Sequence, residues 1–225
     1  MQRFFDIIFS SFALLVLSPL IIPIVILLLF TGEGEVFFLQ ERTGKGGHTF
    51  KLFKFATMLK DSPNIGTGTV TMKNDPRVLP AGKLLRKTKI NELPQLLNIL
   101  FGDMSIIGPR PLTQQTFRSY STETQEIVKQ VRPGLSGVGS IIFREEEKIL
   151  QGEDASIDFY DTVVAPYKGA LEEWFVNHQS LYTYFVAIII TVWAVLFPTT
   201  SVAWKLFRGL PIPPDKLKDA LYYKA

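Results

Sequence analysis

The chain contains no cysteine among its 225 residues. Disulfide bonds, zinc sites with thiolate ligands and cysteine nucleophiles are therefore excluded. Histidine is almost as scarce, and His48 and His178 lie too far apart in the sequence to indicate a histidine-rich metal centre. Excess charge is also small, at +3 from 24 Lys and Arg against 21 Asp and Glu. A charge of this size suits phosphates or an anionic membrane surface, and it does not indicate a nucleic-acid partner.

Hydrophobic residues make up 47% of the chain and are concentrated in two runs. The first run, residues 7–30, has no charged side chain. As a helix it would extend roughly 36 Å, which is enough to cross a bilayer. It is too long for the hydrophobic part of a cleavable signal peptide, and no small-residue cleavage pattern follows it. The sequence therefore predicts a membrane segment at the N-terminus.

The pair Ser18-Pro19 lies in the middle of this run, and Pro23 follows one turn later. Pro19 removes a backbone donor and clashes with the preceding turn, so we expect the helix to bend there. The Ser18 hydroxyl can bond a carbonyl that the bend leaves unpaired. Two interpretations stay open: a helix that spans the bilayer, and a re-entrant helix that returns to the same face. The prolines slightly favour the second.

The second hydrophobic run, residues 181–197, is at the lower length limit for a membrane span. Aromatic residues flank it, and a basic tail follows. This pattern is typical of a helix that lies at the membrane interface. The basic residues of the tail are Lys205, Arg208, Lys216, Lys218 and Lys224. The middle of the chain is basic too, so a single crossing between the two would place one basic segment on the wrong side.

The middle of the chain predicts a small mixed domain. Short apolar runs within residues 33–55, separated by glycines, predict a hairpin of two strands. Residues 82–100 predict two helices that meet near Asn91-Glu92, with Pro94 in the first turn of the second. Residues 122–131 predict a polar helix. The expected fold class is α+β, mostly helical, with three segments: membrane helix 1–31, catalytic domain 32–178, and interfacial helix with basic tail 179–225.

Several basic residues lie on stiff backbone. Arg110 is held between two prolines and Arg132 precedes Pro-Gly, while Arg86 lies just before Asn91-Glu92 and Lys54 lies in Phe-Lys-Phe. A guanidinium group binds phosphate through a planar fork, and a fixed backbone lowers the entropy lost on binding. A single such arginine is more often a solvated surface charge. Pro-Arg-Pro and Arg-Pro-Gly together favour phosphate binding.

The stretch LRKTKINELPQLLNILFGDMSIIGPRP, residues 85–111, closely resembles the signature of the bacterial sugar transferases known as monotopic phosphoglycosyl transferases. The resemblance extends to FDIIFSSFALLVLSPL, FKLFKFATM and VRPGLSG, in the same order, and covers most of residues 1–144. It implies a re-entrant helix broken at Ser18-Pro19 and a catalytic domain at the cytoplasmic face of the bacterial inner membrane.

The resemblance also implies an activity. Members transfer a sugar 1-phosphate from a UDP-sugar to undecaprenyl phosphate and release UMP, with Mg²⁺. This is the first membrane step of an exopolysaccharide, capsule or O-antigen, so downstream glycosyltransferases are the implied partner proteins. In the family mechanism an Asp-Glu dyad supplies an aspartate that takes the phospho-sugar covalently. A lipid phosphate lies at the headgroup plane, and an enzyme at that plane meets it without extraction.

The same resemblance assigns residues. Arg86 and Arg110 match family arginines that contact phosphate, and Arg144 falls at a further family arginine position. Together with Arg132 and Lys54 they form the predicted phosphate-binding set. Glu92 is the predicted catalytic carboxylate and metal ligand. Asp103, in GDMS, matches the family either as a metal ligand or as a loop cap, and capping is the simpler interpretation.

The dyad here is Asn91-Glu92, where the family has Asp-Glu. A carboxamide is a poor nucleophile and a weaker Mg²⁺ ligand than a carboxylate. Three alternatives follow: Glu92 acts as nucleophile or as base for a direct displacement, a different carboxylate replaces the lost one, or the chain is an inactive membrane scaffold that binds nucleotide-sugar or partner enzymes. Glu145, Glu146 and Glu147 follow Arg144, and one of them could restore the charge, although a solvated charge run is the more common case.

Overall fold

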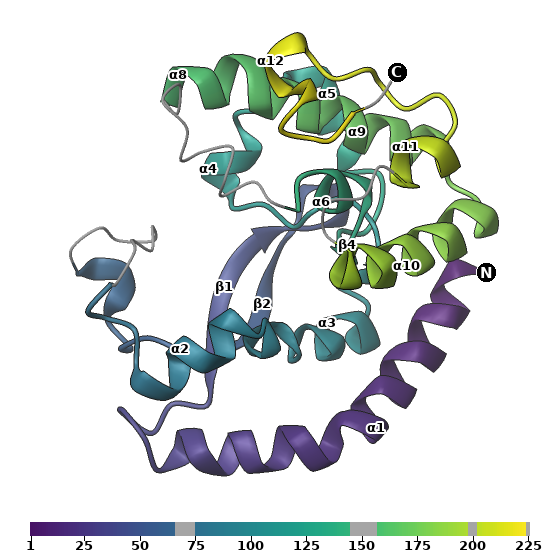
Figure 1. Cartoon of the computed structure of the whole chain (residues 1–225). Coiled ribbons are helices and arrows are strands. Elements are labelled where there is room, and N and C mark those ends of the chain that lie inside the picture. The colour runs from purple at the N-terminus through teal and green to yellow at the C-terminus, as the bar shows by residue number, and fades with distance from the viewer. Residues whose placement is uncertain (66–74, 145–156, 198–201, 224–225) are drawn as a thin grey trace. The chain divides into compact units, whose positions relative to one another are not determined.

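The computed structural model describes residues 1–65, 75–144, 157–197 and 202–223. Contacts divide the chain into two compact units: residues 1–6, 42–50 and 103–225 form the first, and residues 7–41 and 51–102 form the second. In chain order the elements are α1 (Gln2–Leu29), β1 (Phe37–Thr43), η1 (Lys45–Gly47), β2 (Thr49–Phe55), η2 (Ser62–Asn64), α2 (Pro80–Lys87), η3 (Ile90–Glu92), α3 (Gln95–Phe101), β3 (Ser105–Ile107), α4 (Gln114–Phe117), α5 (Thr122–Val128), β4 (Gly134–Ser136), α6 (Val138–Ile142), α8 (Ile157–Phe159), η4 (Tyr160–Val164), α9 (Ala165–Asn177), α10 (Leu181–Leu196), α11 (Val202–Leu206) and α12 (Asp215–Lys218) (Figure 1). The predicted α+β class is confirmed.

Helix α1 runs without interruption through both of its prolines, and its ribbon bends along its length (Figure 1). Because Pro19 has no amide hydrogen, the carbonyl of Leu15 lacks its usual helical donor. The Ser18 hydroxyl donates to that carbonyl at 2.7 Å. The predicted hydrogen bond from Ser18 to the carbonyl left unpaired by Pro19 is therefore confirmed, and the helix stays continuous while it bends (Figure 1).

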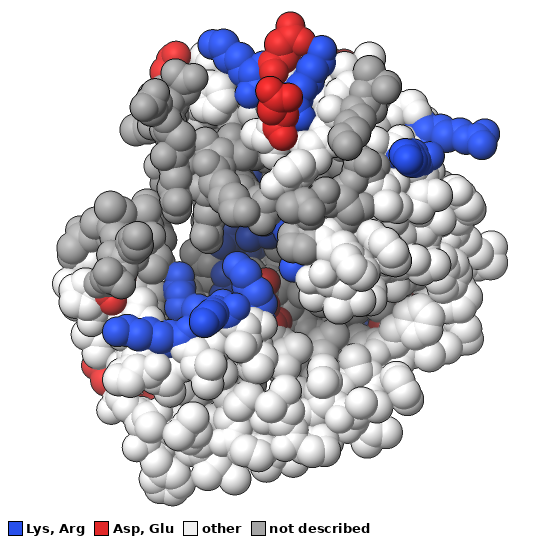
Figure 2. All heavy atoms as spheres, viewed as in Figure 1, with Lys and Arg blue, Asp and Glu red and all other residues white. Residues whose placement is uncertain are grey.

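The side chains of α1 fit contact with lipid. The helix is the one described helix that is long and apolar enough to cross a membrane. Phe12 and Leu15 are 64% and 72% exposed, whereas a core helix of a water-soluble domain would bury such residues. The surface over α1 in Figure 2 carries no Lys, Arg, Asp or Glu. An exposed apolar surface of this extent marks an interaction site.

The predicted hairpin is confirmed by the pairing of β1 with β2. Turn η1 joins the strands, and Gly44 N–H donates to His48 O at 2.7 Å. Gly46 and Gly47 have φ angles of 71° and 79°, which side chains with a Cβ rarely adopt. The glycine-rich stretch thus forms a turn.

In the second unit, one apolar cluster joins α1 to the hairpin and to α2. Its buried members are Ile24, Leu28, Phe55 and Leu85. Asn98 of α3 is fully buried and fixes β2, because its Oδ1 accepts from Phe53 N–H at 2.9 Å and its Nδ2 donates to Lys51 O at 2.8 Å.

In the first unit, β3 and β4 pair in parallel, with Ser105 opposite Gly134. Asp6, at the start of α1, is buried and ties three elements together. Its Oδ1 accepts from Ser105 Oγ at 3.0 Å, from Ile106 N–H at 3.0 Å and from Tyr184 Oη at 2.9 Å. The first turns of α1 are thereby bonded to β3 and α10.

Helix α10 has two apolar faces with different environments. Tyr184, Ala187 and Ile190 are buried in the first unit, while Ile189 and Leu196 are exposed. The exposed face agrees with the expectation of a helix that meets a membrane surface. The chain after α10 packs back on the unit, because Phe207, Leu217 and Leu221 are buried and Tyr167 Oη donates to Pro211 O at 2.8 Å.

Candidate active site

The predicted site residues fall into two groups, one in each unit. Asn91, Glu92, Arg86 and Lys54 belong to the second unit. The first unit contains Arg110, Arg132, Arg144 and Asp103. The binding of one substrate by residues of both groups stays a prediction.

The Asn91-Glu92 pair lies on a sharp turn between two helices, as predicted. Helix α2 ends at Lys87, and Lys89 then adopts a left-handed conformation with φ 60°. This conformation is uncommon outside glycine, asparagine and aspartate. The single 3₁₀ turn η3 holds the pair, and Pro94 caps α3 one residue before its first turn. The backbone thus presents two adjacent polar side chains at a fixed corner.

Apolar residues on both sides anchor this corner. Ile90 and Leu93, which flank the pair, pack against the buried cluster that includes Ile24 and Leu28 of α1. Because both side chains are only partly buried, their packing stabilises the turn by less than the roughly 3–6 kcal/mol that full burial of two such side chains would give. The Asn91-Glu92 corner is therefore attached to the C-terminal half of α1.

The two side chains of the corner differ in environment. Asn91 is 8% exposed, and its Oδ1 is buried without a hydrogen-bond partner among the described residues. A buried acceptor left unpaired costs roughly 1–3 kcal/mol. Glu92 is half-buried. An unsatisfied oxygen beside a carboxylate is suited to accept a donor or a cation from a ligand.

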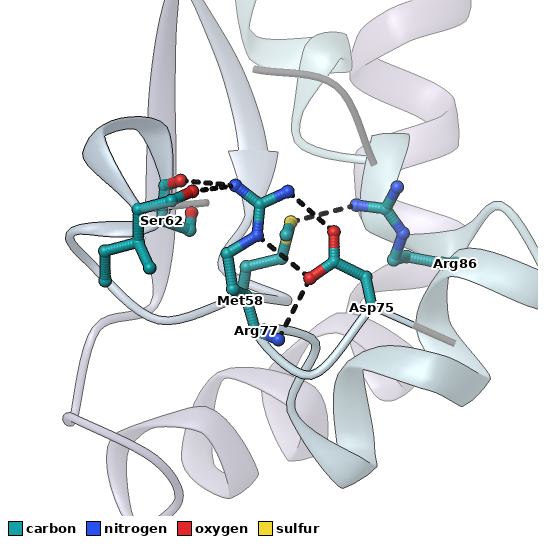
Figure 3. Close-up of polar contacts among 6 residues, drawn as sticks. Met58, Ser62, Asp75, Arg77 and Arg86 are labelled. Carbon is teal, nitrogen blue, oxygen red and sulfur yellow. Dashed lines mark hydrogen bonds and ion pairs between the residues drawn. The ribbon is translucent and has the colours of Figure 1, made fainter. Parts of the chain in front are cut away.

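Arg86 lies on α2, close to a rigid buried ion pair (Figure 3). One of its guanidinium nitrogens contacts Met58 Sδ at 3.6 Å. Nearby, Arg77 bonds both carboxylate oxygens of Asp75, at 2.9 and 2.6 Å, and donates to Ser62 O at 2.7 Å. A bidentate buried pair of this kind fixes backbone geometry. Its signal in the sequence is Asp75-Pro76-Arg77, just before α2.

Lys54 lies on β2, and its side chain is half-buried. The amide N–H of Phe53, its neighbour, is the group bonded by Asn98. The strand that presents Lys54 is thus fixed to α3, the helix that follows the Asn91-Glu92 corner.

In the first unit, the parallel pairing of β3 with β4 brings Pro109-Arg110-Pro111 beside Arg132-Pro133-Gly134. Ser105 N–H donates to Pro133 O and Gly134 N–H donates to Pro109 O, both at 2.8 Å. The backbones approach so closely that a Cβ on Gly108 would lie 2.5 Å from the carbonyl oxygen of Arg132. The two stiff motifs therefore lie side by side through a parallel strand pair that nothing in the sequence predicted. Phosphate binding by their arginines stays a prediction.

The arginines of the first unit differ in how far they are exposed to solvent. Arg110 is exposed, whereas Arg132 is half-buried and lines a hollow of about 140 Å³. Arg3 and Lys45 also line that hollow, together with Asp6. Arg144 is exposed just after α6. Glu145, Glu146 and Glu147 lie outside the described residues, so their proposed role stays a hypothesis.

Glu172 is a buried carboxylate that the sequence reasoning missed. It lies in α9 and is 1% exposed. Its Oε1 accepts from Arg110 N–H at 3.3 Å, while Oε2 has no partner among the described residues. Burial raises the pKa of Glu172 to about 7, against the lowering effects of the Arg110 N–H and of the charge of Lys168. The available signal was a pair of acids, Glu172 and Glu173, between the apolar residues Leu171 and Trp174.

The described residues contain no group of three or more His, Cys, Asp or Glu side chains arranged to hold a metal ion. Mg²⁺, however, is often bound by one or two protein oxygens together with substrate phosphates. The Glu92 carboxylate and the unpaired Oδ1 of Asn91 fit that mode. Asp103 lies in the other unit, and its part in a metal site stays a prediction.

A model of the family described as bacterial sugar transferase matches residues 1–198. The chain is 36% identical over 159 residues to the exopolysaccharide production protein ExoY of Rhizobium meliloti (strain 1021), covering 64% of this chain and 70% of that protein. It is 44% identical over 110 residues to a putative undecaprenyl-phosphate N-acetylgalactosaminyl 1-phosphate transferase of Bacillus subtilis (strain 168), covering 49% of this chain and 61% of that protein.

Longer proteins are also similar to this chain. A UDP-N-acetylgalactosamine-undecaprenyl-phosphate N-acetylgalactosaminephosphotransferase of Aeromonas hydrophila is 37% identical over 143 residues. The match covers 63% of this chain and 34% of that protein, so the chain corresponds to about a third of its length.

Proposed function

Because the chain belongs to the bacterial sugar transferase family, we propose that it transfers a sugar 1-phosphate from a UDP-sugar to undecaprenyl phosphate. The products are undecaprenyl-diphosphate-sugar and UMP. The names of the relatives from Aeromonas hydrophila and Klebsiella pneumoniae describe this type of reaction. Relatives named for exopolysaccharide production support a role in the first membrane step of a bacterial glycoconjugate.

One observation about the molecule carries the proposal. The Asn91-Glu92 corner packs through Ile90 and Leu93 against α1, the apolar helix of membrane-spanning length. The phosphate of a polyprenyl lipid lies where the hydrocarbon region ends, and a site attached to a membrane helix can meet it there. In a water-soluble nucleotide-sugar enzyme, this attachment would serve no purpose.

We propose that α1 is re-entrant and that the catalytic domain lies at the cytoplasmic face of the inner membrane, where UDP-sugars are made. The bend of α1 and the Ser18 hydrogen bond to Leu15 O support this arrangement. The exposed face of α10 and the basic tail would lie at the same interface.

The reaction breaks the bond between the β-phosphorus of the UDP-sugar and the oxygen that bridges to the α-phosphorus. UMP leaves with the α-phosphate, and the β-phosphate stays on the sugar. The phosphates are anionic, as is the carboxylate that they approach, so fixed guanidinium groups offset the repulsion. Arg86 and Arg110 are the proposed contacts, with Arg132, Arg144 and Lys54 as further members of the set.

The residue that accepts the phospho-sugar is not Asn91 in its present form, because a carboxamide is a poor nucleophile. Glu92 is the adjacent carboxylate. We propose that Glu92 either takes the phospho-sugar covalently or acts as the base for direct attack of the lipid phosphate on the β-phosphorus. Trapping a phospho-sugar on the protein would exclude the second route.

Glu92 and Asn91 Oδ1 would hold a Mg²⁺ ion jointly with the substrate phosphates. When bound, the ion supplies positive charge that stabilises the departing UMP. The protein residues orient the phosphates and hold the lipid and nucleotide at one place.

Incubation of the membrane-embedded protein with a panel of UDP-sugars and undecaprenyl phosphate tests the proposal. We expect UMP release with at least one sugar, and loss of that release in Glu92→Gln, since the substitution removes the only carboxylate of the corner. The exposed Glu123→Gln of α5 is the matched control and should keep the wild-type rate. Full activity of Glu92→Gln would show that Glu92 is not the catalytic carboxylate.

Asn91 supports one second candidate, a non-catalytic scaffold of the same fold that binds nucleotide-sugar or partner enzymes. The scaffold predicts saturable UDP-sugar binding without UMP release at any pH or metal concentration. If the protein is an enzyme, both UDP-sugar binding and UMP release are expected.

A further inference from the structure

Resting on the proposed function, we propose that Glu172 is a positioning residue that fixes the backbone of Arg110 for phosphate binding. Glu172 lies on α9, more than sixty residues after Arg110 in the sequence. It contacts the main chain of the Pro-Arg-Pro loop and is fully buried, so it acts through Arg110 and not on the substrate.

The contact uses the only backbone donor that the motif has. Pro109 and Pro111 lack an N–H, so Arg110 N–H is the single donor of the three residues, and it donates to Glu172 Oε1 at 3.3 Å. The carbonyls on either side are also bonded, since Pro109 O accepts from Gly134 N–H and Pro111 O accepts from Arg42 Nη1. The Arg110 N–H and the carbonyls of both flanking prolines are thereby hydrogen-bonded.

The fold makes room for this carboxylate. A Cβ on Gly139, in α6, would lie 2.5 Å from Glu172 Oε1 and 3.0 Å from its carboxyl carbon. Any side chain at position 139 would therefore displace the carboxylate. Gly139 of α6 therefore leaves the space that the Glu172 carboxylate occupies beside the Arg110 N–H.

The energetics favour a functional reason for the acid. A buried carboxylate whose second oxygen has no partner is expensive, and an apolar or amide side chain of similar volume would stabilise the fold more. Burial raises the pKa of Glu172, and the charge of Lys168, one turn earlier on α9, lowers it only in part. Groups with such perturbed environments concentrate at functional sites.

Positioning has a direct chemical effect. Arginine loses rotamer and backbone entropy when it grips a phosphate, and a backbone that is already fixed leaves less to lose. Loosening the loop should weaken phosphate binding without touching the reacting carboxylate at position 92.

A double-mutant cycle between positions 172 and 110 tests the proposal. Glu172→Met removes the acceptor and keeps the volume, while Glu172→Gln keeps an oxygen acceptor for Arg110 N–H. We expect Glu172→Met to lower kcat/KM by about tenfold in the wild-type background and by less than about twofold in Arg110→Ala, since the two residues act as one unit. Glu172→Gln should restore most of the loss.

Glu173→Gln is the matched control, because Glu173 is the adjacent acid on α9 and accepts from Thr124 Oγ1 instead of from the Arg110 N–H. It should leave kcat/KM within twofold of wild type. Equal losses from Glu172→Met in both Arg110 backgrounds would mean that Glu172 supports the fold in general, and the proposal would be wrong.

Measuring the affinity for UDP in the same double-mutant cycle separates this inference from the proposed function. If the wild type releases no UMP, the proposed function fails, yet coupling of positions 172 and 110 in UDP binding would still support positioning. Absence of UDP binding, or additive effects on it, would overturn the inference itself.

Discussion

At the scale of single residues, Asn91 decides which chemistry the corner can perform. Its Oδ1 is buried and unpaired among the described residues, so an acceptor is already held in place there. A carboxylate at this position would differ from the amide by one atom and one charge. The geometry of the corner therefore suits an aspartate, and the residue type alone removes the nucleophile.

Asn91→Asp should create a covalent intermediate. We expect intact-protein mass spectrometry, after incubation with UDP-sugar and no lipid acceptor, to show a mass increase of one phospho-sugar in this variant. Asn177→Asp, at the exposed end of α9, is the control and should show none. An unmodified Asn91→Asp protein that still binds UDP-sugar would indicate a rearrangement of the site beyond one substitution.

Glu172 makes stability depend on pH. Its pKa is about 7 in the folded protein, whereas an exposed glutamate titrates near 4.3, so unfolding releases a proton between these values. The free energy of unfolding should therefore fall as the pH rises from about 4.5 to about 7, by roughly 3 kcal/mol from this residue.

Chemical unfolding in detergent at a series of pH values measures this effect. Glu172→Gln should flatten the curve over that window, and Glu173→Gln should not. A free energy of unfolding that falls across the window as steeply in Glu172→Gln as in the wild type would contradict the assignment.

At the scale of elements, the sequence predicted those whose signals are local. The hairpin, the two helices around Asn91-Glu92 and the second apolar helix followed from glycine placement, hydrophobic periodicity and Pro94. The short strands β3 and β4 were missed, because a parallel pair of three residues each is defined by hydrogen bonds between distant segments and has no periodic signal of its own.

Helix α1 gives an element-level prediction about topology. If it is re-entrant, the N-terminus and α2 lie on the same side of the membrane. The chain has no cysteine, so a single cysteine inserted after Met1, or Lys87→Cys on exposed α2, can be labelled alone. In intact spheroplasts neither should react with a membrane-impermeant maleimide, and both should react after lysis.

Replacing both Pro19 and Pro23 by alanine should straighten the helix, because each alanine restores a backbone donor. A substantial fraction of the N-terminal cysteine should then become labelled in intact spheroplasts, while Lys87→Cys stays protected. Labelling of the N-terminal cysteine in the chain with both prolines would instead establish a spanning helix.

At the scale of the whole molecule, the site residues that lie in contiguous motifs were predictable from the sequence. The residues that hold those motifs through hydrogen bonds to distant parts of the chain were not. Arg110 and Arg132 were proposed from their prolines, and the structure brings their loops together. Glu172, Asp6 and the Asp75–Arg77 pair were not found, because each acts through a partner that only the fold supplies: the Arg110 amide, the Ile106 amide and the Ser62 carbonyl.

The central claim is that the β-phosphate of a nucleotide-sugar moves with the sugar to a lipid phosphate at the membrane. Incubation of the purified protein with undecaprenyl phosphate and a UDP-sugar carrying ³²P at the β-position measures this transfer directly. The account predicts label in the lipid fraction of the wild type, unlabelled UMP in solution, and no labelled lipid with Glu92→Gln. Label confined to the unreacted nucleotide-sugar, across a panel of sugars and with Mg²⁺ present, would contradict it.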